Sequence, residues 1–213
     1  MNGIRERIIK HYLILCVITM AAGIIFYYVS PGKPVIALIT DITGYAALFI
    51  LAFSLVIGPY NFWIKRKNPV STYFRRDIGI FGGVLAVIHT GTGLFVHMAG
   101  RPWLYFMKQA GESLKIRLDR FGFANDSGLL ATLIIILLIT ISNDFFLQKL
   151  KASRWKNIQR FSYFMFIFTL IHAVLYRVGA QNHWPLIIMY LSIFIIVLLI
   201  QFSGVYYKIW KKT

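Results

Sequence analysis

The sequence is poor in cysteine and in acidic residues, and both shortages exclude classes of protein. Cys16 is the single cysteine among 213 residues, which excludes an internal disulfide framework and a metal cluster built from the thiolates of this chain alone. Asp and Glu number 7 against 23 Lys and Arg. The basic residues stand in short runs between apolar segments and form no common face, so they predict membrane topology and no nucleic-acid partner.

Apolar residues make up 58% of the chain and charged residues 14%. A water-soluble domain has no place for so much apolar surface. The composition therefore predicts an integral membrane protein whose surroundings are the lipid bilayer.

Six apolar runs long enough to span a bilayer follow one another along the sequence. Turns rich in Gly and Pro, short basic loops and one long connection separate them. We predict an all-α membrane protein, a six-transmembrane-helix bundle that forms a single domain over residues 1–213. The expected spans cover residues 11–29, 39–60, 77–98, 129–147, 161–178 and 186–203.

The distribution of Lys and Arg predicts the orientation of the bundle. Sixteen of them lie at the amino end, in the loops after the second and fourth spans and in the tail, while seven lie on the opposite side. Because Lys and Arg concentrate on the cytoplasmic side of membrane proteins, we expect both termini in the cytoplasm. The third and fifth spans then run outward.

Two histidines are expected at the same depth in the third and fifth spans. His89 lies 13 residues after Arg76, and His172 lies 12 residues after Arg160. Both are therefore roughly 18 to 20 Å from the inner boundary, where ionisable side chains are costly and indicate function. A depth-matched pair on separate helices predicts the two axial ligands of a b-type haem, whereas one histidine alone is explained by a hydrogen bond to a neighbouring helix.

Small residues surround His89 on one face of its span. They recur at spacings of three and four, so this face is nearly bare apart from the imidazole. Such a face leaves room for a flat macrocycle, although small residues also serve close helix packing in membranes. We expect the cofactor to lie against Gly82, Ala86 and Gly93.

A further pattern joins the third and fifth spans with the basic loop before the fifth. It consists of Arg-Arg-x-Ile-Gly-Ile from residue 75, followed by His89, Trp155, Arg160, Tyr163 and His172. This pattern resembles the ferric-reductase-like transmembrane domain, a six-helix haem module found in MsrQ (YedZ) proteins, NADPH oxidases and STEAP metalloreductases. The resemblance covers the second to sixth spans.

The resemblance implies transmembrane electron transfer. Electrons would pass from a cytoplasmic flavin reductase or a membrane quinol to a redox acceptor on the periplasmic or extracellular side, and MsrQ-like members serve a periplasmic methionine sulfoxide reductase. The chain would be the membrane electron-transfer component of an oxidoreductase, multi-pass in the bacterial cytoplasmic (inner) membrane. No Gly-rich dinucleotide fingerprint follows a predicted strand, so any NAD(P)H oxidation would belong to a partner.

The sequence departs from two-haem members of this family, which carry a second histidine pair one haem layer farther inward. The corresponding positions are near Arg75 and Gln159, and neither residue is a usual haem ligand. We therefore expect one haem b, in the outer half. FMN, FAD or a quinone is expected in the inner half, where Arg75, Arg76, Lys156 and Arg160 are candidate contacts for a phosphate or head group, with positive-inside topology as the alternative.

The outer side carries the remaining candidates. His97 is expected near the surface, where it would contact a haem propionate, replace His89 as ligand or be solvated. His183 lies in the last outer turn. Residues 102–118 predict a short helix on the membrane surface, with a solvated linker as the alternative. The basic residues available there for propionates or an anionic acceptor are Arg101, Lys108, Lys115, Arg117 and Arg120.

Two other functions stay open on the sequence alone. The first is a haem-free membrane transporter or scaffold in which the histidines only bridge helices, so that purified protein would show no Soret band. The second is a haem-based sensor with an open coordination position, which predicts high-spin haem. The electron-transfer hypothesis predicts six-coordinate, low-spin haem.

Overall fold

Long apolar helices make up most of the described part of the chain. The computed structural model describes residues 2–63, 73–98, 100–111, 113–178 and 184–210. In chain order the elements are α1 (Asn2–Arg7), the π-helix η1 (Ile8–Leu13), α2 (Ile14–Val29), α3 (Val35–Trp63), α4 (Tyr73–Gly93), the 3-10 helix η3 (Pro102–Tyr105), β1 (Met107–Ala110), β2 (Ser113–Ile116), α5 (Arg120–Thr140), α6 (Asp144–Gln159), α7 (Phe161–Arg177) and α8 (Trp184–Trp210).

Five described helical segments are long and apolar enough to cross a bilayer, namely Arg5–Val29, Val35–Asn61, Arg120–Thr140, Asp144–Arg177 and Trp184–Tyr207. The prediction of an all-α, multi-pass membrane protein is thereby confirmed. α4 is not among the five, because its 21 residues begin with the charged run Arg75, Arg76 and Asp77. It nevertheless packs between α3 and α5, and its role as a sixth span stays a prediction.

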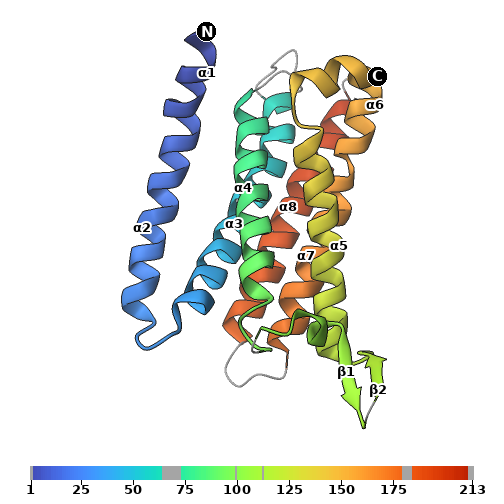
Figure 1. The fold of residues 1–213 in the computed structure, drawn as a ribbon. Coiled ribbons are helices and arrows are strands. Elements are labelled where there is room, and N and C mark those ends of the chain that lie inside the picture. The colour runs from blue at the N-terminus through green and yellow to red at the C-terminus, as the bar shows by residue number, and fades with distance from the viewer. Residues whose placement is uncertain (1, 64–72, 99, 112, 179–183, 211–213) are drawn as a thin grey trace.

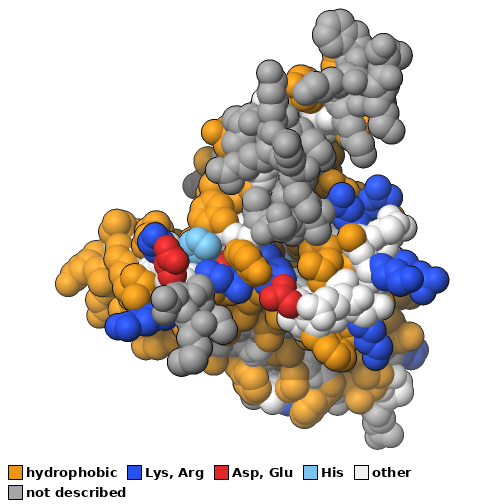
Figure 2. Space-filling view, turned by 90° about the horizontal axis from the view of Figure 1, so that it is seen from above, with side chains coloured by type: hydrophobic (Ala, Val, Ile, Leu, Met, Phe, Trp, Pro, Cys, Tyr) orange, Lys and Arg blue, Asp and Glu red, His pale blue; other side chains and the backbone are white. Residues whose placement is uncertain are grey.

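Helices α3, α4, α5, α7 and α8 form one bundle, and the first helix stands beside it (Figure 1). α1 and the end of α8 lie at the same end of the bundle, which we call the terminal end; α6 also lies there. Lys and Arg side chains gather over this end (Figure 2). The β1–β2 hairpin projects from the other end, called here the hairpin end. One part of the core joins three helices through Leu48, Ala52, Leu55, Phe166, Tyr190 and Val197.

Several helix boundaries differ from the expected spans. α4 ends at Gly93, before His97, because the Tyr105 hydroxyl donates to the Gly93 carbonyl oxygen at 2.7 Å and the chain turns there. α5 begins nine residues earlier than expected because Asp119 caps it, accepting from the Gly122 amide at 2.8 Å. Hydrogen bonds from single polar side chains therefore set both helix boundaries, and hydropathy alone does not reveal them.

The basic segment from residue 149 to 160, expected as a loop, is most of helix α6. Asn143 starts this helix by accepting a hydrogen bond from the Phe146 amide at 2.9 Å. The helix is broken at Lys151, whose backbone has φ 58° and ψ 152°, a conformation that costs a residue with a side chain about 1–3 kcal/mol. Trp155 anchors the second part by donating to the Ile141 carbonyl oxygen at 2.9 Å.

The expected surface helix in residues 102–118 is wrong. A single turn of 3-10 helix is followed by an antiparallel hairpin in which Met107 pairs with Ile116 and Lys108 with Lys115. Gly111 supplies the turn with a φ of +64°, which glycine adopts without steric cost. Apolar and basic residues alternate at Met107 and Lys108 and again over residues 114–116, and this period of two favours a strand over a helix.

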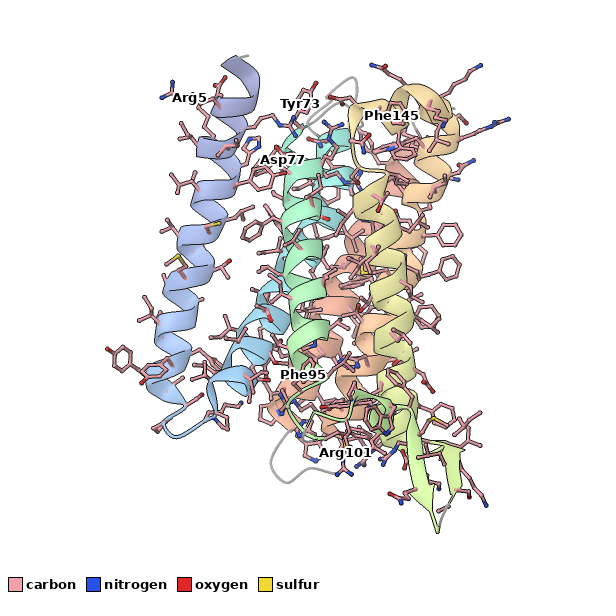
Figure 3. All side chains as sticks on the ribbon, in the orientation of Figure 1. Arg5, Tyr73, Asp77, Phe95, Arg101 and Phe145 are labelled. Atoms are coloured by element: carbon pink, nitrogen blue, oxygen red, sulfur yellow. The ribbon has the colours of Figure 1, made fainter. Side chains whose placement is uncertain are left out.

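The first helix is attached to the bundle through Asp77 of α4 at the terminal end (Figure 3). The Asp77 carboxylate is fully buried. It accepts hydrogen bonds from Arg7 Nε at 3.0 Å and from the Tyr12 hydroxyl at 3.1 Å. His11 Nδ1 lies 2.6 Å from one of its oxygens. A second guanidinium nitrogen of Arg7 donates to the other carboxylate oxygen. A buried carboxylate is tolerated only when it is paired and hydrogen-bonded in this way, so the cluster fixes the position of η1 against α4.

Candidate functional site

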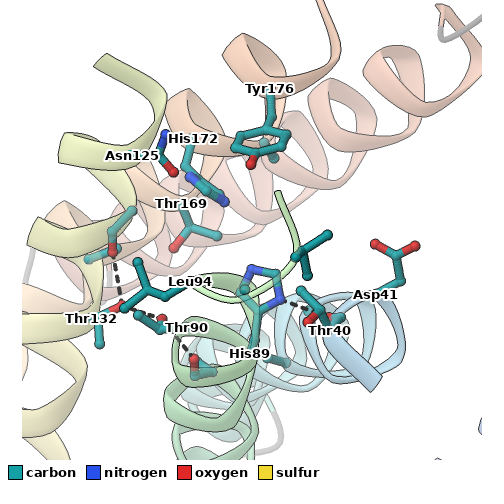
Figure 4. Close-up of a pocket in the computed structure, with 18 of the residues that line it drawn as sticks. Thr40, Asp41, His89, Thr90, Leu94, Asn125, Thr132, Thr169, His172 and Tyr176 are labelled. Atoms are coloured by element: carbon teal, nitrogen blue, oxygen red, sulfur yellow. Dashed lines mark hydrogen bonds between the residues drawn. The ribbon is translucent and has the colours of Figure 1, made fainter. Parts of the chain in front are cut away.

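A cavity of about 640 Å³ lies in the half of the bundle nearer the hairpin end, and the side chains of His89 and His172 both line it (Figure 4). Its wall is mostly apolar and comes from α3, α4, α5, α7 and α8. The volume falls within the usual range for cofactor and ligand pockets.

His89 is held by a backbone group of the neighbouring helix α3. Its Nδ1 lies 2.8 Å from the Thr40 carbonyl oxygen. Because a carbonyl only accepts, Nδ1 carries the proton and Nε2 keeps a free lone pair. Gly44, one turn further along α3, makes room for the ring, since a Cβ atom there would lie 2.6 Å from His89 Nδ1.

His172 is held in the same manner by α5. Its Nδ1 lies 2.7 Å from the Ala124 carbonyl oxygen, which again leaves Nε2 as the nitrogen with a free lone pair. Gly128, one turn after Ala124, provides the space, because a Cβ atom at this position would lie 2.6 Å from His172 Nδ1.

The two halves of the bundle thus repeat one arrangement. In each, a helix offers a carbonyl oxygen and, four residues later, a glycine. The partner histidine follows the carbonyl by 49 residues in the first half and by 48 in the second. Each imidazole is therefore fixed in the same tautomer, with the nitrogen that can bind a metal left available.

The two imidazoles approach each other inside the cavity. Their ring centroids are 6.0 Å apart and the ring planes are nearly perpendicular, at 82°. The rings come from opposite sides, His89 from α4 and His172 from α7 (Figure 4). The expectation that these two residues lie at one depth is met by this contact.

The other residues expected around His89 divide into two groups. Ala86, Gly93 and His97 line the cavity. Gly82 faces α3 instead, where a Cβ atom would lie 2.9 Å from the Ile50 side chain. Gly82 therefore serves the close approach of α3 and α4, the bland alternative for a small residue on a membrane helix.

Three residues of the layer in which an inner cofactor was expected are hydrogen-bonded to other parts of the chain. Arg75 Nε donates to the Ser54 carbonyl oxygen at 3.1 Å. Arg76 pairs with Asp144 at 2.6 Å, and Gln159 donates to the Ser142 hydroxyl at 3.1 Å. The lining of the cavity includes none of these three side chains. His183 lies outside the described residues.

Polar residues stand where the cavity approaches the hairpin end, and the sequence pattern did not single them out. Lys33 pairs with Asp41, and Arg177 donates to the Tyr45 hydroxyl at 3.2 Å. All four residues line the cavity. Lys33 and Arg177 therefore supply positive charge at one end of a largely apolar chamber, and the only sequence signal for them was a lone basic residue near each outer turn.

Within the described part of the chain, no group of three or more His, Cys, Asp and Glu side chains gathers to bind a metal ion. Protein side chains of this region thus offer at most two imidazoles to one metal.

The chain was compared with models of known protein families. The family model described as the ferric reductase like transmembrane component matches residues 43–170. This range is more than half of the chain and includes His89, and it ends two residues before His172. A comparison with curated proteins finds no match.

Proposed function

The chain belongs to the family of ferric-reductase-like transmembrane components, and we propose that it carries electrons across a membrane through one b-type haem ligated by His89 and His172. The family assignment supports a membrane electron-transfer role. The identity of the cofactor and its ligands is our inference from the cavity.

The separation of the two imidazoles is the observation that carries this proposal. A metal-to-imidazole bond is about 2 Å long, and the ring centroid lies about 1 Å behind the bonded nitrogen, so two rings that share one metal have centroids about 6 Å apart. The observed distance is 6.0 Å. With both Nδ1 atoms engaged by carbonyl oxygens, the two Nε2 atoms are the available ligands.

The chemistry of the cavity also fits haem. Two imidazoles satisfy only the axial positions of an iron, and a porphyrin supplies the four equatorial nitrogens. Small residues such as Ala86 and Gly93 leave space beside the rings, and Lys33 and Arg177 offer positive charge to the haem carboxylates. When bound, haem supplies a one-electron iron couple to the site.

The side chains in the terminal half of the bundle favour a single haem. The Arg75 guanidinium occupies the layer in which two-haem relatives would place an inner ligand, and a Cβ atom at Gly58 would lie 3.2 Å from Arg75 Nη1. Among the described histidines, His11 bonds to Asp77 and His97 lies beyond the cavity pair. No second pair therefore stands in the described terminal half.

We further propose that the terminal end faces the cytoplasm of a bacterial cell, because the amino end, the loops after the second and fourth predicted spans and the tail carry sixteen of the 23 basic residues in the sequence. Electrons would enter there from a flavin-dependent reductase or a membrane quinol, and FMN, FAD or a quinone would bridge the terminal half. They would leave at the hairpin end to an acceptor in the periplasm or outside the cell.

The direct test is an absorbance spectrum of the purified protein with haem quantified per chain. We expect one low-spin haem per chain, lost in His89→Ala and in His172→Ala. His97→Ala is the matched control and should keep the Soret band. Haem retained unchanged in both ligand variants would overturn the assignment, and two haems per chain would refute the single site. Protein without a Soret band would indicate a scaffold, and high-spin haem a sensor.

A further inference from the structure

A line of aromatic rings connects His172 with the surface of the hairpin end. The His172 ring centroid is 5.4 Å from that of Tyr176, and Tyr176 is 5.5 Å from Phe121. Phe121 is in turn stacked with Tyr105 at 5.6 Å. Tyr176 and Tyr105 both line the cavity, whereas Phe121 is not part of its lining, so Phe121 is the ring of this line that lies behind the cavity wall.

The line of rings ends at an accessible surface. His97 is exposed and lies 5.9 Å from the Tyr176 ring. The guanidinium of Arg117 lies over the Phe121 ring at 5.0 Å. Electron tunnelling becomes slower with every gap between π systems, so these contacting rings offer a route from His172 toward the surface of the hairpin end.

The hairpin is attached at the same place. The Arg117 amide donates to the Phe106 carbonyl oxygen at 2.8 Å, which extends the ladder beyond β1 and β2. Tyr105, the residue before Phe106, is 1% exposed and belongs to the line of rings. The position of the hairpin is therefore fixed relative to this line of aromatic rings, His172, Tyr176, Phe121 and Tyr105, which we call the ring ladder.

The hairpin carries positive charge in an unfavourable arrangement. Lys108 and Lys115 face each other directly across the two strands, and like charges in such pairs destabilise a sheet. Apart from Glu112, which lies between the two strands in the sequence, the nearest acidic residue is Asp119, and it is engaged by Arg117 at 3.6 Å and caps α5. Five basic residues lie in or beside the hairpin, namely Arg101, Lys108, Lys115, Arg117 and Arg120.

One face of the hairpin is apolar and exposed. Alternation along the strands puts Leu114 and Ile116 opposite the lysine face, and their exposed fractions are 51% and 68%. An exposed apolar face beside a cluster of like charges is a combination typical of protein interaction sites.

We propose that the hairpin is the docking site of a soluble redox protein with an acidic surface, and that the ring ladder is the route by which the electron reaches it. This inference rests on the proposed haem. With haem bound, its iron would supply one electron in going from Fe(II) to Fe(III), and the docked acceptor would be reduced by that electron. No bond is broken and no proton is needed.

The shape of the hairpin end favours a protein over a lipid surface as the partner. The hairpin projects past the end of α5 and away from the helices that would face lipid (Figure 1). A segment lying flat on the bilayer would instead pack its apolar face beside them. Anionic lipid is kept as the alternative outcome of the test.

The charge of the docking site is tested in lipid nanodiscs by stopped-flow reoxidation of the reduced haem. Plastocyanin serves as an acidic acceptor and cytochrome c as a basic one. In Lys108→Glu/Lys115→Glu we expect the rate with plastocyanin to fall about tenfold at low salt and the rate with cytochrome c to rise. Both changes should vanish at high ionic strength.

Lys149→Glu/Arg154→Glu is the matched control, because both residues are exposed on α6 at the terminal end. It changes the net charge equally and should leave both rates unaltered. Equal effects of the two double variants, or no effect of the hairpin variant, would overturn the docking site. An effect seen only in nanodiscs with anionic lipid, and equal for both acceptors, would assign the hairpin to the bilayer.

The route is tested at Phe121. Phe121→Leu should slow reoxidation severalfold with an unchanged Soret spectrum, and Phe121→Tyr, which keeps the ring, should retain the wild-type rate. Unaltered kinetics in Phe121→Leu would refute the ladder. The outcomes separate this inference from the proposed function, because protein that binds no haem fails in its spectrum before any rate is measured.

Discussion

Gly44 lies so close to His89 that a Cβ atom at Gly44 would come within 2.6 Å of the imidazole Nδ1. We predict that Gly44→Ala displaces the His89 ring and breaks its hydrogen bond to Thr40. Overpacking of this kind costs about 1–3 kcal/mol. The measurements are the haem content per chain, which should fall sharply, and the thermal unfolding midpoint, which should decrease.

The repeat predicts the same result for Gly128→Ala, since the added methyl group would meet His172 at the same distance. Gly91→Ala is the control on the same helix as His89. Nothing lies within 4 Å of a Cβ atom there, and alanine favours a helix over glycine by up to about 1 kcal/mol. Full haem content in either Gly44→Ala or Gly128→Ala would contradict the role we give to the close contact.

Asp77→Asn should loosen the first helix from the bundle. The substitution removes the negative charge that Arg7 and His11 share, and breaking a buried ion pair costs about 3–5 kcal/mol. We expect a lower unfolding midpoint in detergent and faster backbone hydrogen exchange in residues 5–29, with exchange in α7 unaltered.

The control for Asp77 is Asp144→Asn, which breaks the ion pair with Arg76. The Asp144 side chain is 56% exposed, whereas that of Asp77 is fully buried. Exposed pairs contribute at most about 1 kcal/mol. Equal destabilisation by the two substitutions would show that the Asp77 cluster does not hold the first helix.

Tyr105→Phe should release the segment after α4. The Tyr105 hydroxyl donates to the Gly93 carbonyl oxygen at 2.7 Å and accepts from the His97 amide at 2.9 Å. Each hydrogen bond of this kind contributes about 0.5–1.5 kcal/mol to stability. We expect faster hydrogen exchange at residues 94–98 and a lower unfolding midpoint. Tyr27→Phe, on the exposed side of α2, should change neither, and an equal effect there would argue against the two hydrogen bonds.

The sequence was sufficient for the class of protein and for the pairing of His89 with His172. Long apolar runs specify membrane helices, and the distance of each histidine from a basic boundary residue specifies its depth. Both signals are local and periodic, so they can be read without knowledge of the neighbouring helices. The haem itself stays a prediction.

The contacts that orient the histidines could not be predicted. Thr40, Gly44, Ala124 and Gly128 lie on other helices and act through a backbone carbonyl or a missing side chain, which leave almost no trace in composition. A repeated small residue one turn after the acceptor was the only available signal. Gly82 shows the opposite case. The sequence pattern placed it on the His89 face of the helix, but it lies against α3.

Hydropathy alone could not predict the helix boundaries or the structure of the long outer connection. Asp119 and Asn143 start helices by capping, and the Tyr105 hydrogen bonds end one. The period of two in residues 107–116 was the signal for the hairpin, but its apolar and basic content also fits a surface helix. Arg75 and Arg76 are recognisable in the sequence as a basic pair at the start of a span. Their partners Ser54 and Asp144 became known only from the fold.

The repeated carbonyl and glycine arrangement also has a consequence for biosynthesis. α3 and α4 precede α5 and α7 in the chain, so the half that orients His89 can be completed while the second half is still being translated. His172 joins only when α7 has been inserted beside α5. A cofactor that needs both histidines therefore has to be loaded after α7 has been inserted, into a site whose first half is already shaped to receive it.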